Sequence, residues 1–274
     1  MSCYVPDYLT RGRTGLSESS YPPEFVTNLE MRWGVGFLSP GGPEEVLEIL
    51  RGIKVEGKKV LDIGCGTGGP DIVIGKELNP SLIIGVDVEP YLVEKCRENI
   101  SSAGLANLID IQLIEVGPLP FADQTFDVVF SKDSLIHVTD KSALYAEVLR
   151  VLRPGGVFAA SDWLRSVNAD KLDGYNEWLS LTAHDFSIQT DSKTRAEMKN
   201  AGLVEVETRD RNAWYTETAG EEVLLMKSTE WRDSFIQAFG EESYVKKLAL
   251  RTANARAAEC GGLRPTHLFG YRPK

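Results

Sequence analysis

The segment from Val60 to Gly69, VLDIGCGTGG, constrains the fold of this chain more than any other. The apolar run KVLDI at residues 59–63 ends in glycines with the GxGxxG spacing, and a helical pattern follows from about Pro70 to Leu78. A strand that passes through a tight glycine loop into a helix begins a βαβ unit, and glycine lets a ligand approach the backbone closely. The segment therefore predicts a parallel sheet with a ligand site at the carboxyl edge of its strands.

The alternation of strand and helix continues along the chain. Further strands are predicted over residues 82–88, 108–115, 127–131 and 157–163, with helices over 91–104 and 142–152 and a turn at 153–156. Apolar strands without polar alternation are typical of strands that are buried on both faces. We predict an α/β fold with a doubly wound, Rossmann-like, mostly parallel seven-stranded sheet.

Segments outside this alternation predict helical additions to the sheet. Residues 1–50 are expected to form an N-terminal helical lid, with a helix over 42–53, ahead of one domain that spans 51–274. Within that domain we expect cap insertions at about 164–190 and 212–262. A helix over 190–202 and a strand over 203–209 separate them, and a final strand covers 267–273.

Composition excludes several classes of partner. Of the 274 residues, 30 are Lys or Arg and 40 are Asp or Glu, giving a formal net charge of −10 without any basic run, so nucleic acid and anionic lipid are repelled. No apolar stretch approaches the ~20 residues that span a bilayer, and the N-terminus does not resemble a signal peptide. We expect a cytoplasmic protein, with a monomer favoured.

Cysteine and histidine usage gives no sign of a disulfide framework or a metal site. The four cysteines have no CxxC spacing, and the three histidines stand at no ligand spacing from them or from one another. The sequence therefore predicts reduced thiols and no bound metal.

Two acidic residues distinguish the glycine loop from a dinucleotide fingerprint. Asp62 stands two positions before Gly64, where a carboxylate suits a ligand with a cationic end better than a pyrophosphate. Asp87 ends the next predicted strand, about where such folds hydrogen-bond a ribose, although a helix cap is the alternative. Because the chain also lacks a Tyr-x-x-x-Lys set, an NAD-dependent dehydrogenase is disfavoured.

Four successive motifs resemble those of the class I S-adenosylmethionine-dependent methyltransferases. They are LDIGCGTGG at 61–69, GVDVEP at 85–90, PLPFADQTFDVV at 118–129 and LRPGG at 152–156. The resemblance implies S-adenosylmethionine as cofactor and S-adenosylhomocysteine as product. It also implies that Asp62 lies near the methionine amino group, that Asp87 binds the ribose hydroxyls and that Glu115 and Val116 flank the adenine. The cofactor set is completed by Gly64, Gly66 and Val88.

Two other segments resemble the phosphoethanolamine N-methyltransferases of plants, nematodes and protozoa. SKDSLIH at 131–137 and WGVGFLSPGG at 33–42 are similar to that family's SRDxxLH and FGxxFxSxGG segments. The resemblance implies a cofactor contact for Ser39. Counted back from Trp33 without a gap, Tyr21 falls where the family has a tyrosine that pairs with the histidine, here His137. Sarcosine and dimethylglycine methyltransferases have an SQDxxLH-like segment, so this motif leaves both acceptor classes open.

Methylation of an amine supplies a chemical reason for these residues. An ammonium group has no lone pair, so it must lose a proton first, and histidine is suited to accept it near neutral pH. We predict His137 as the base or gatekeeper, Tyr21 as its hydrogen-bonding partner and lid, and Asp133 as the carboxylate that holds the cationic amine. The alternatives are that His137 caps a helix and that Asp133 is a solvated acid in a loop. Because both residues follow the same strand, we favour the functional roles over these alternatives.

Further contacts with the acceptor are predicted from the region after the fifth strand. Trp163 and Trp178 stand where the phosphobase enzymes have aromatic residues, and His184 lies near their expected Arg and Tyr. We predict that all three bind substrate, the tryptophans as faces for a methylated ammonium, although packing of a cap is the alternative.

The sequence thus favours N-methylation of a small amine, first phosphoethanolamine or its mono- and dimethylated forms, in phosphocholine synthesis. A glycine, sarcosine or dimethylglycine enzyme making betaine is second, and another small-molecule methyltransferase or a noncatalytic binding protein remains open.

Overall fold

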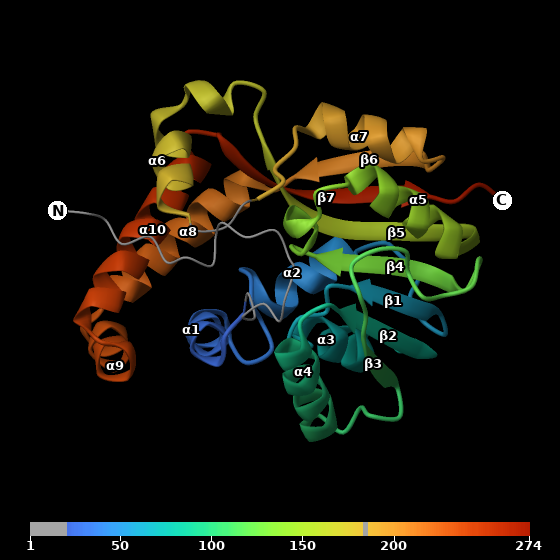
Figure 1. The fold of residues 1–274 in the computed structure, drawn as a ribbon, viewed down its shortest axis with the longest axis horizontal. Coiled ribbons are helices and arrows are strands. Elements are labelled where there is room, and N and C mark those ends of the chain that lie inside the picture. Colours follow the sequence, from blue (N-terminus) through green and yellow to red (C-terminus); the bar gives the residue numbers. More distant parts are fainter. Residues whose placement is uncertain (1–20, 183–185) are drawn as a thin grey trace.

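A single seven-stranded sheet forms the centre of the computed structural model, which describes residues 21–182 and 186–274. The strands stand in the order β3-β2-β1-β4-β5-β7-β6 (Figure 1). Neighbours from β3 to β5 pair in parallel, and β7 is antiparallel to both β5 and β6. The predicted mostly parallel α/β fold is confirmed. The strands are β1 (Lys59–Ile63), β2 (Leu82–Asp87), β3 (Ile109–Leu113), β4 (Phe126–Lys132), β5 (Leu152–Arg165), β6 (Val204–Asp210) and β7 (Leu263–Tyr271).

Helices cover both faces of the sheet, as the apolar strands require. One hydrophobic cluster packs α2 (Gly42–Ile49), α3 (Gly69–Glu77) and α4 (Pro90–Ser102) against the strands. A second cluster packs α5 (Lys141–Val151) and α7 (Asp191–Asn200). Thr190 caps α7 by accepting a hydrogen bond from the Lys193 amide, and Gly202 with φ +104° follows its end, as the sequence predicts.

The remaining helices form a cap beyond one end of the strands. They are α6 (Asp173–Leu181), α8 (Asn212–Lys227), α9 (Thr229–Phe239) and α10 (Glu241–Glu259), gathered to the left of the sheet in Figure 1. They fall within the two predicted insertions and have their own apolar cluster around Tyr175, Trp178 and Tyr215. Within the described ranges, every helix is too short or too polar to span a membrane.

The helix predicted before the first strand packs into the core. Val46 and Ile49 of α2 are fully buried in the main core, so α2 belongs to the layer of helices packed against the sheet. Among the described residues, α1 (Pro23–Trp33) and the loop at 34–41 lie ahead of this helix.

Candidate active site

Three positions of the loop after β1 have a backbone conformation that favours glycine. Gly64, Gly66 and Gly68 all have positive φ angles, of 76°, 56° and 86°. A Cβ atom on Gly64 would lie 2.4 Å from the Cβ of Ser134, in the turn after β4. The loop is therefore a close-packed backbone surface at the carboxyl ends of β1 and β4, where such folds bind ligands.

Asp62 and Asp87 meet at this edge because β1 and β2 are parallel neighbours. Asp87 accepts hydrogen bonds from the amides of Gly66 and Glu89, each at 3.0 Å. Neither carboxylate oxygen of Asp62 has a hydrogen-bond donor among the described residues, and the side chain is 1% exposed. Burial raises the pKa of Asp62, with Asp71 adding to the shift, and burial also raises that of Asp87. A ligand with a cationic end would supply what Asp62 lacks.

The other predicted cofactor residues lie on the same edge. Val88 follows β2 and is 39% exposed, while Glu115 and Val116 follow β3 and are exposed to solvent. Ser39 lies in the loop before α2, where its hydroxyl accepts a hydrogen bond of 2.6 Å from Lys132 Nζ.

Lys132 fastens this loop to the sheet, a role that sequence reasoning missed. Its buried ammonium also donates to the Pro40 carbonyl and to Asp133 Oδ2, both at 2.8 Å. A second attachment joins the Gly69 amide to the Gly36 carbonyl at 2.9 Å. The available signal was a charged residue at the end of an apolar strand, which is costly to bury without partners.

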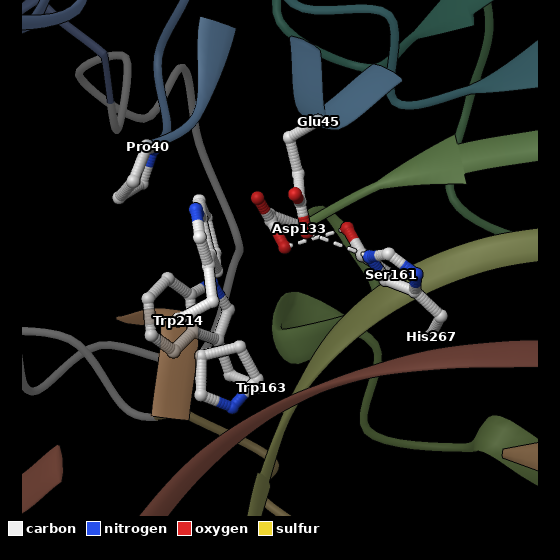
Figure 2. A pocket seen from close by; sticks show the side chains of 8 residues that line it. Pro40, Glu45, Asp133, Ser161, Trp163, Trp214 and His267 are labelled. Carbon is white, nitrogen blue, oxygen red and sulfur yellow. Dashed lines mark hydrogen bonds and ion pairs between the residues drawn. The ribbon is translucent and has the colours of Figure 1, made fainter. Parts of the chain in front are cut away.

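Asp133 has a left-handed backbone and a tightly held side chain. Its φ of +59° lies in the left-handed region, which costs a non-glycine residue about 1–3 kcal/mol and persists where neighbours enforce it. Ser161 donates to Oδ1 at 2.7 Å (Figure 2). Lys132 donates to Oδ2, so both oxygens of the carboxylate are held.

A small pocket lies beside Asp133, with acidic groups on one side and indole rings on the other (Figure 2). Its lining consists of Pro40, Glu45, Asp133, Ser161, Trp163, Trp214, Pro265 and His267. Trp163 and Trp214 are the two indoles of this lining. Trp178 is 5% exposed and stacks on Phe186 within the apolar cluster of the cap. His184 lies outside the described residues.

The structure brings Tyr21 and His137 together. The tyrosine hydroxyl lies 3.1 Å from His137 Nε2, at the end of the short turn Leu135–His137 that follows β4. Burial raises the pKa of Tyr21, and Asp87 and Glu89 raise it further, so the hydroxyl keeps its proton. A hydroxyl that keeps its proton can donate to Nε2 or accept from it, so the contact can orient the imidazole in either tautomer.

Glu45 is a second acidic group that sequence reasoning missed. Its carboxylate accepts two hydrogen bonds from Arg211, at 3.0 and 2.7 Å, and its Oε1 lies 2.7 Å from His267 Nε2. Burial alone would raise the pKa of Glu45, but the hydrogen bonds from His267 and Arg211 lower it to about 2. The carboxylate is thus ionised at neutral pH.

A cationic cluster, Arg32, Lys247 and Arg251, lies behind the aromatic wall. Arg251 donates to the Tyr215 hydroxyl at 2.9 Å, and the Tyr215 ring contacts the Trp163 ring with centroids 4.7 Å apart. Burial and Arg251 lower the pKa of Arg32 to about 9, and burial with the two guanidinium groups lowers that of Lys247.

The cluster has more positive than negative charge. Among the residues that the structure describes, Glu222 is the one carboxylate at ion-pair distance from it, 3.3 Å from Arg251. An excess of partly buried cations is a place for an anionic group.

The family model that matches this chain and its curated relatives are methyltransferases. A family model described as "Methyltransferase domain" matches residues 54–224. Phosphoethanolamine N-methyltransferase 1 of Arabidopsis thaliana is 27% identical over 231 residues, which cover 84% of this chain and 45% of that protein. Sterol 24-C-methyltransferase erg-4 of Neurospora crassa is 31% identical over 65% of this chain and 49% of its own length. The chain thus spans about half the length of these relatives.

Solved structures share the fold over most of the chain. Phosphoethanolamine N-methyltransferase 2 of Haemonchus contortus, in complex with phosphomonomethylethanolamine and S-adenosylhomocysteine, has a TM-score of 0.83 at 20% identity, covering 98% of this chain and 60% of that one. A putative sarcosine dimethylglycine methyltransferase from Galdieria sulphuraria has a TM-score of 0.70 at 22% identity and 84% coverage of both chains.

Proposed function

The chain belongs to the methyltransferase-domain family, and from this we propose that it methylates the nitrogen of a small amine that also carries an anionic group, with S-adenosylmethionine as donor. The acceptors that we favour are phosphoethanolamine and its mono- and dimethylated forms. Family membership is what the sequence motifs predict, whereas the acceptor is inferred from the pocket.

The residues at the carboxyl edge fit this donor. When bound, S-adenosylmethionine supplies a methyl group that its sulfonium already activates. Asp62 would accept hydrogen bonds from the ammonium of its methionine part, since neither of its oxygens has a described donor. Asp87 would accept from the ribose hydroxyls, because each oxygen has a lone pair beyond its one backbone bond. Glu115 and Val116 would flank the adenine.

The distribution of charge around Trp163 carries the acceptor proposal. Asp133 and Glu45 lie on the pocket side of this residue, and Tyr215 with the cationic cluster lies behind it. A molecule with an ammonium at one end and a phosphate at the other matches that order of charges. Neither a purely cationic nor a purely apolar acceptor would use both the acidic side chains and the cationic cluster. This disfavours sterols, which the names of some relatives mention, as acceptors.

His137 and Tyr21 would prepare the amine for transfer. Asp133 fixes the position of the cationic nitrogen, and His137, four residues further along, accepts its proton. The Tyr21 hydroxyl orients the imidazole. Much of the rate enhancement would come from aligning the nitrogen lone pair with the methyl group.

A carboxylated amine such as glycine, sarcosine or dimethylglycine is a second candidate. The observation that favours it is the guanidinium pair of the cationic cluster, Arg32 and Arg251, because guanidinium binds carboxylate as readily as phosphate.

Methyl transfer to a panel of acceptors tests the proposal. Purified protein with labelled donor should methylate phosphoethanolamine or its methylated forms with kcat/KM at least about tenfold above that for ethanolamine, which lacks the anion. Preference for sarcosine or dimethylglycine would establish the second candidate. Equal rates with ethanolamine, or no labelled amine at all, would contradict an amine acceptor held at both ends.

A pair of arginine variants locates the anionic end. Arg251→Ala should raise KM for the preferred acceptor about tenfold and leave donor affinity unchanged, since Arg251 belongs to the cationic cluster. Arg256→Ala is the matched control on the same helix, where the exposed guanidinium pairs with Glu177 at the surface. Equal KM values for both variants would remove the cluster from acceptor binding.

A further inference from the structure

Three potential metal ligands converge beneath the glycine loop. Cys65 lies within the loop, Asp71 in the first turn of α3 and Cys96 in α4. Their two sulfurs and a carboxylate oxygen all lie within 4.8 Å of one another. The three residues come from separate elements, so ligand spacing in the sequence does not reveal them. The fold alone creates the cluster.

The cluster is buried and lacks hydrogen-bond donors. Cys65, Asp71 and Cys96 are 2%, 0% and 0% exposed. Both carboxylate oxygens of Asp71 are without a hydrogen-bond partner in the described part of the chain. A buried carboxylate in that condition costs several kcal/mol if it is ionised, and thiols are only weak donors. Such a group requires a cation or a proton.

The surroundings of the cluster add negative charge. Asp62, itself without a described donor, lies close enough to Asp71 that the Asp71 carboxyl group helps to raise the pKa of Asp62. The cation that acts on Asp62 is Lys132, whose ammonium already donates to Ser39, Pro40 and Asp133. Positive charge is therefore scarce beneath the loop.

Two glycines keep this space clear of other side chains. A Cβ atom on Gly68 would lie 2.6 Å from Cys96 Sγ. One on Gly85 of β2 would lie 3.0 Å from Cys65 Cβ and 3.2 Å from a carboxylate oxygen of Asp71. Larger residues at either position would displace the ligand atoms.

We propose that Cys65, Asp71 and Cys96 bind Zn²⁺ or a similar thiolate-preferring divalent cation. Two sulfurs and one carboxylate oxygen belong to the ligand types that zinc takes in tetrahedral sites, and they would occupy three of the four positions. On binding, each thiol releases one proton to solvent and becomes a thiolate, and no electron is transferred. The ion neutralises Asp71 and ties the glycine loop to α3 and α4.

Zinc content of the folded protein is the first test. The full chain, produced in zinc-supplemented medium and desalted, should contain about one Zn²⁺ per chain. Cys65→Ser and Cys96→Ser should each lose most of it. Cys260→Ser is the matched control, because this cysteine is exposed and far from the loop in sequence, and it should keep the metal.

Cobalt gives a test that does not depend on metal acquired in the cell. Protein refolded under reducing conditions with Co²⁺ should develop the near-ultraviolet thiolate-to-cobalt absorption and melt about 5 °C higher than metal-free protein. Asp71→Asn should weaken binding at least about tenfold while both thiols remain, a readout that survives if a cysteine variant fails to fold.

Three results would overturn the site. They are wild-type protein with neither zinc nor the cobalt absorption, Cys260→Ser losing metal as fully as Cys96→Ser, and a Cys65–Cys96 disulfide in the native protein. None of these readouts depends on the methyl acceptor, so the proposal stands or falls apart from the proposed function.

Discussion

At the scale of single residues, Asp133 shows how the pocket is held in place. Its backbone is in the left-handed region, and Ser161 and Lys132 each occupy one carboxylate oxygen. Each oxygen keeps a further lone pair for an ammonium ligand. The neighbouring residues thus fix the carboxylate before any acceptor arrives, which lowers the entropy that binding must overcome.

Removal of the imidazole tests the proposed base. His137→Ala should lower kcat by about 10² to 10⁴, the range typical of a lost general base, and leave donor affinity within about twofold. Steady-state kinetics with the preferred acceptor and equilibrium titration with S-adenosylhomocysteine measure the two quantities.

Tyr21→Phe should have a smaller effect, because it removes one hydrogen bond and keeps the ring. A loss of about three- to tenfold in kcat is expected. Thr139→Ala, at an exposed position two residues after His137, serves as the control. Turnover that stays at the wild-type value in His137→Ala would exclude the histidine from proton transfer.

Several residues could be predicted because their positions follow from the strand edge. The glycine loop, Asp62, Asp87 and Asp133 all lie at the carboxyl ends of strands, and a gap-free count places Tyr21 opposite His137. The face of a helix that meets a pocket depends on tertiary packing instead. Trp178 therefore lies inside the cap while Trp214 lines the pocket.

At the scale of elements, the loop before α2 and the glycine loop form one packed unit. A Cβ atom on Gly69 would lie 2.5 Å from the Gly36 carbonyl oxygen, which accepts the Gly69 amide hydrogen bond. Gly69→Ala should separate the two loops, destabilise the protein by about 1–3 kcal/mol and weaken donor binding. Denaturant unfolding and titration with S-adenosylhomocysteine measure these effects.

Gly220→Ala in α8 is the matched control for that substitution. No atom lies within 4 Å of the added methyl group, and alanine favours helix over glycine, so stability should rise by roughly 0.5–1 kcal/mol. If both variants lowered stability equally, the contact between the loops would not be the cause.

Strands and helices of the core follow from hydrophobic patterning, whereas contacts between elements do not. The sequence predicts α7 with its Thr190 cap and the helices between β6 and β7. It assigns α2 to a lid because the helix precedes the first strand, yet α2 lies in the core. Tertiary packing likewise brings Cys65 next to Cys96, and it also assembles the cationic cluster.

At the scale of the whole molecule, Glu45 joins distant parts of the chain. It links α2 to Arg211 before α8 and to His267 of β7. Its folded pKa of about 2 lies below the ordinary value of 4.5, so its stabilising effect is complete above about pH 4.5 and is lost as the pH falls toward 2.

Acid unfolding of a Glu45 variant tests this linkage. Glu45→Gln should be less stable than wild type at pH 6 by on the order of 2 kcal/mol, and the difference should shrink between pH 5 and pH 3. Glu44→Gln, at the exposed neighbouring position, should show no such narrowing. A difference that stays constant with pH would show that the carboxylate's charge is not responsible.

The antiparallel insertion of β7 between β5 and β6 has a consequence for biosynthesis. β6 has no partner in the sheet until β7 is made, some fifty residues later. β5 pairs with β4 on one side, but its other edge stays unpaired for longer still, until β7 is made. Both strands present unpaired edges while the ribosome adds the cap helices. Non-local pairing of this kind slows folding, so we expect the nascent chain to need protection by chaperones until Tyr271 has emerged.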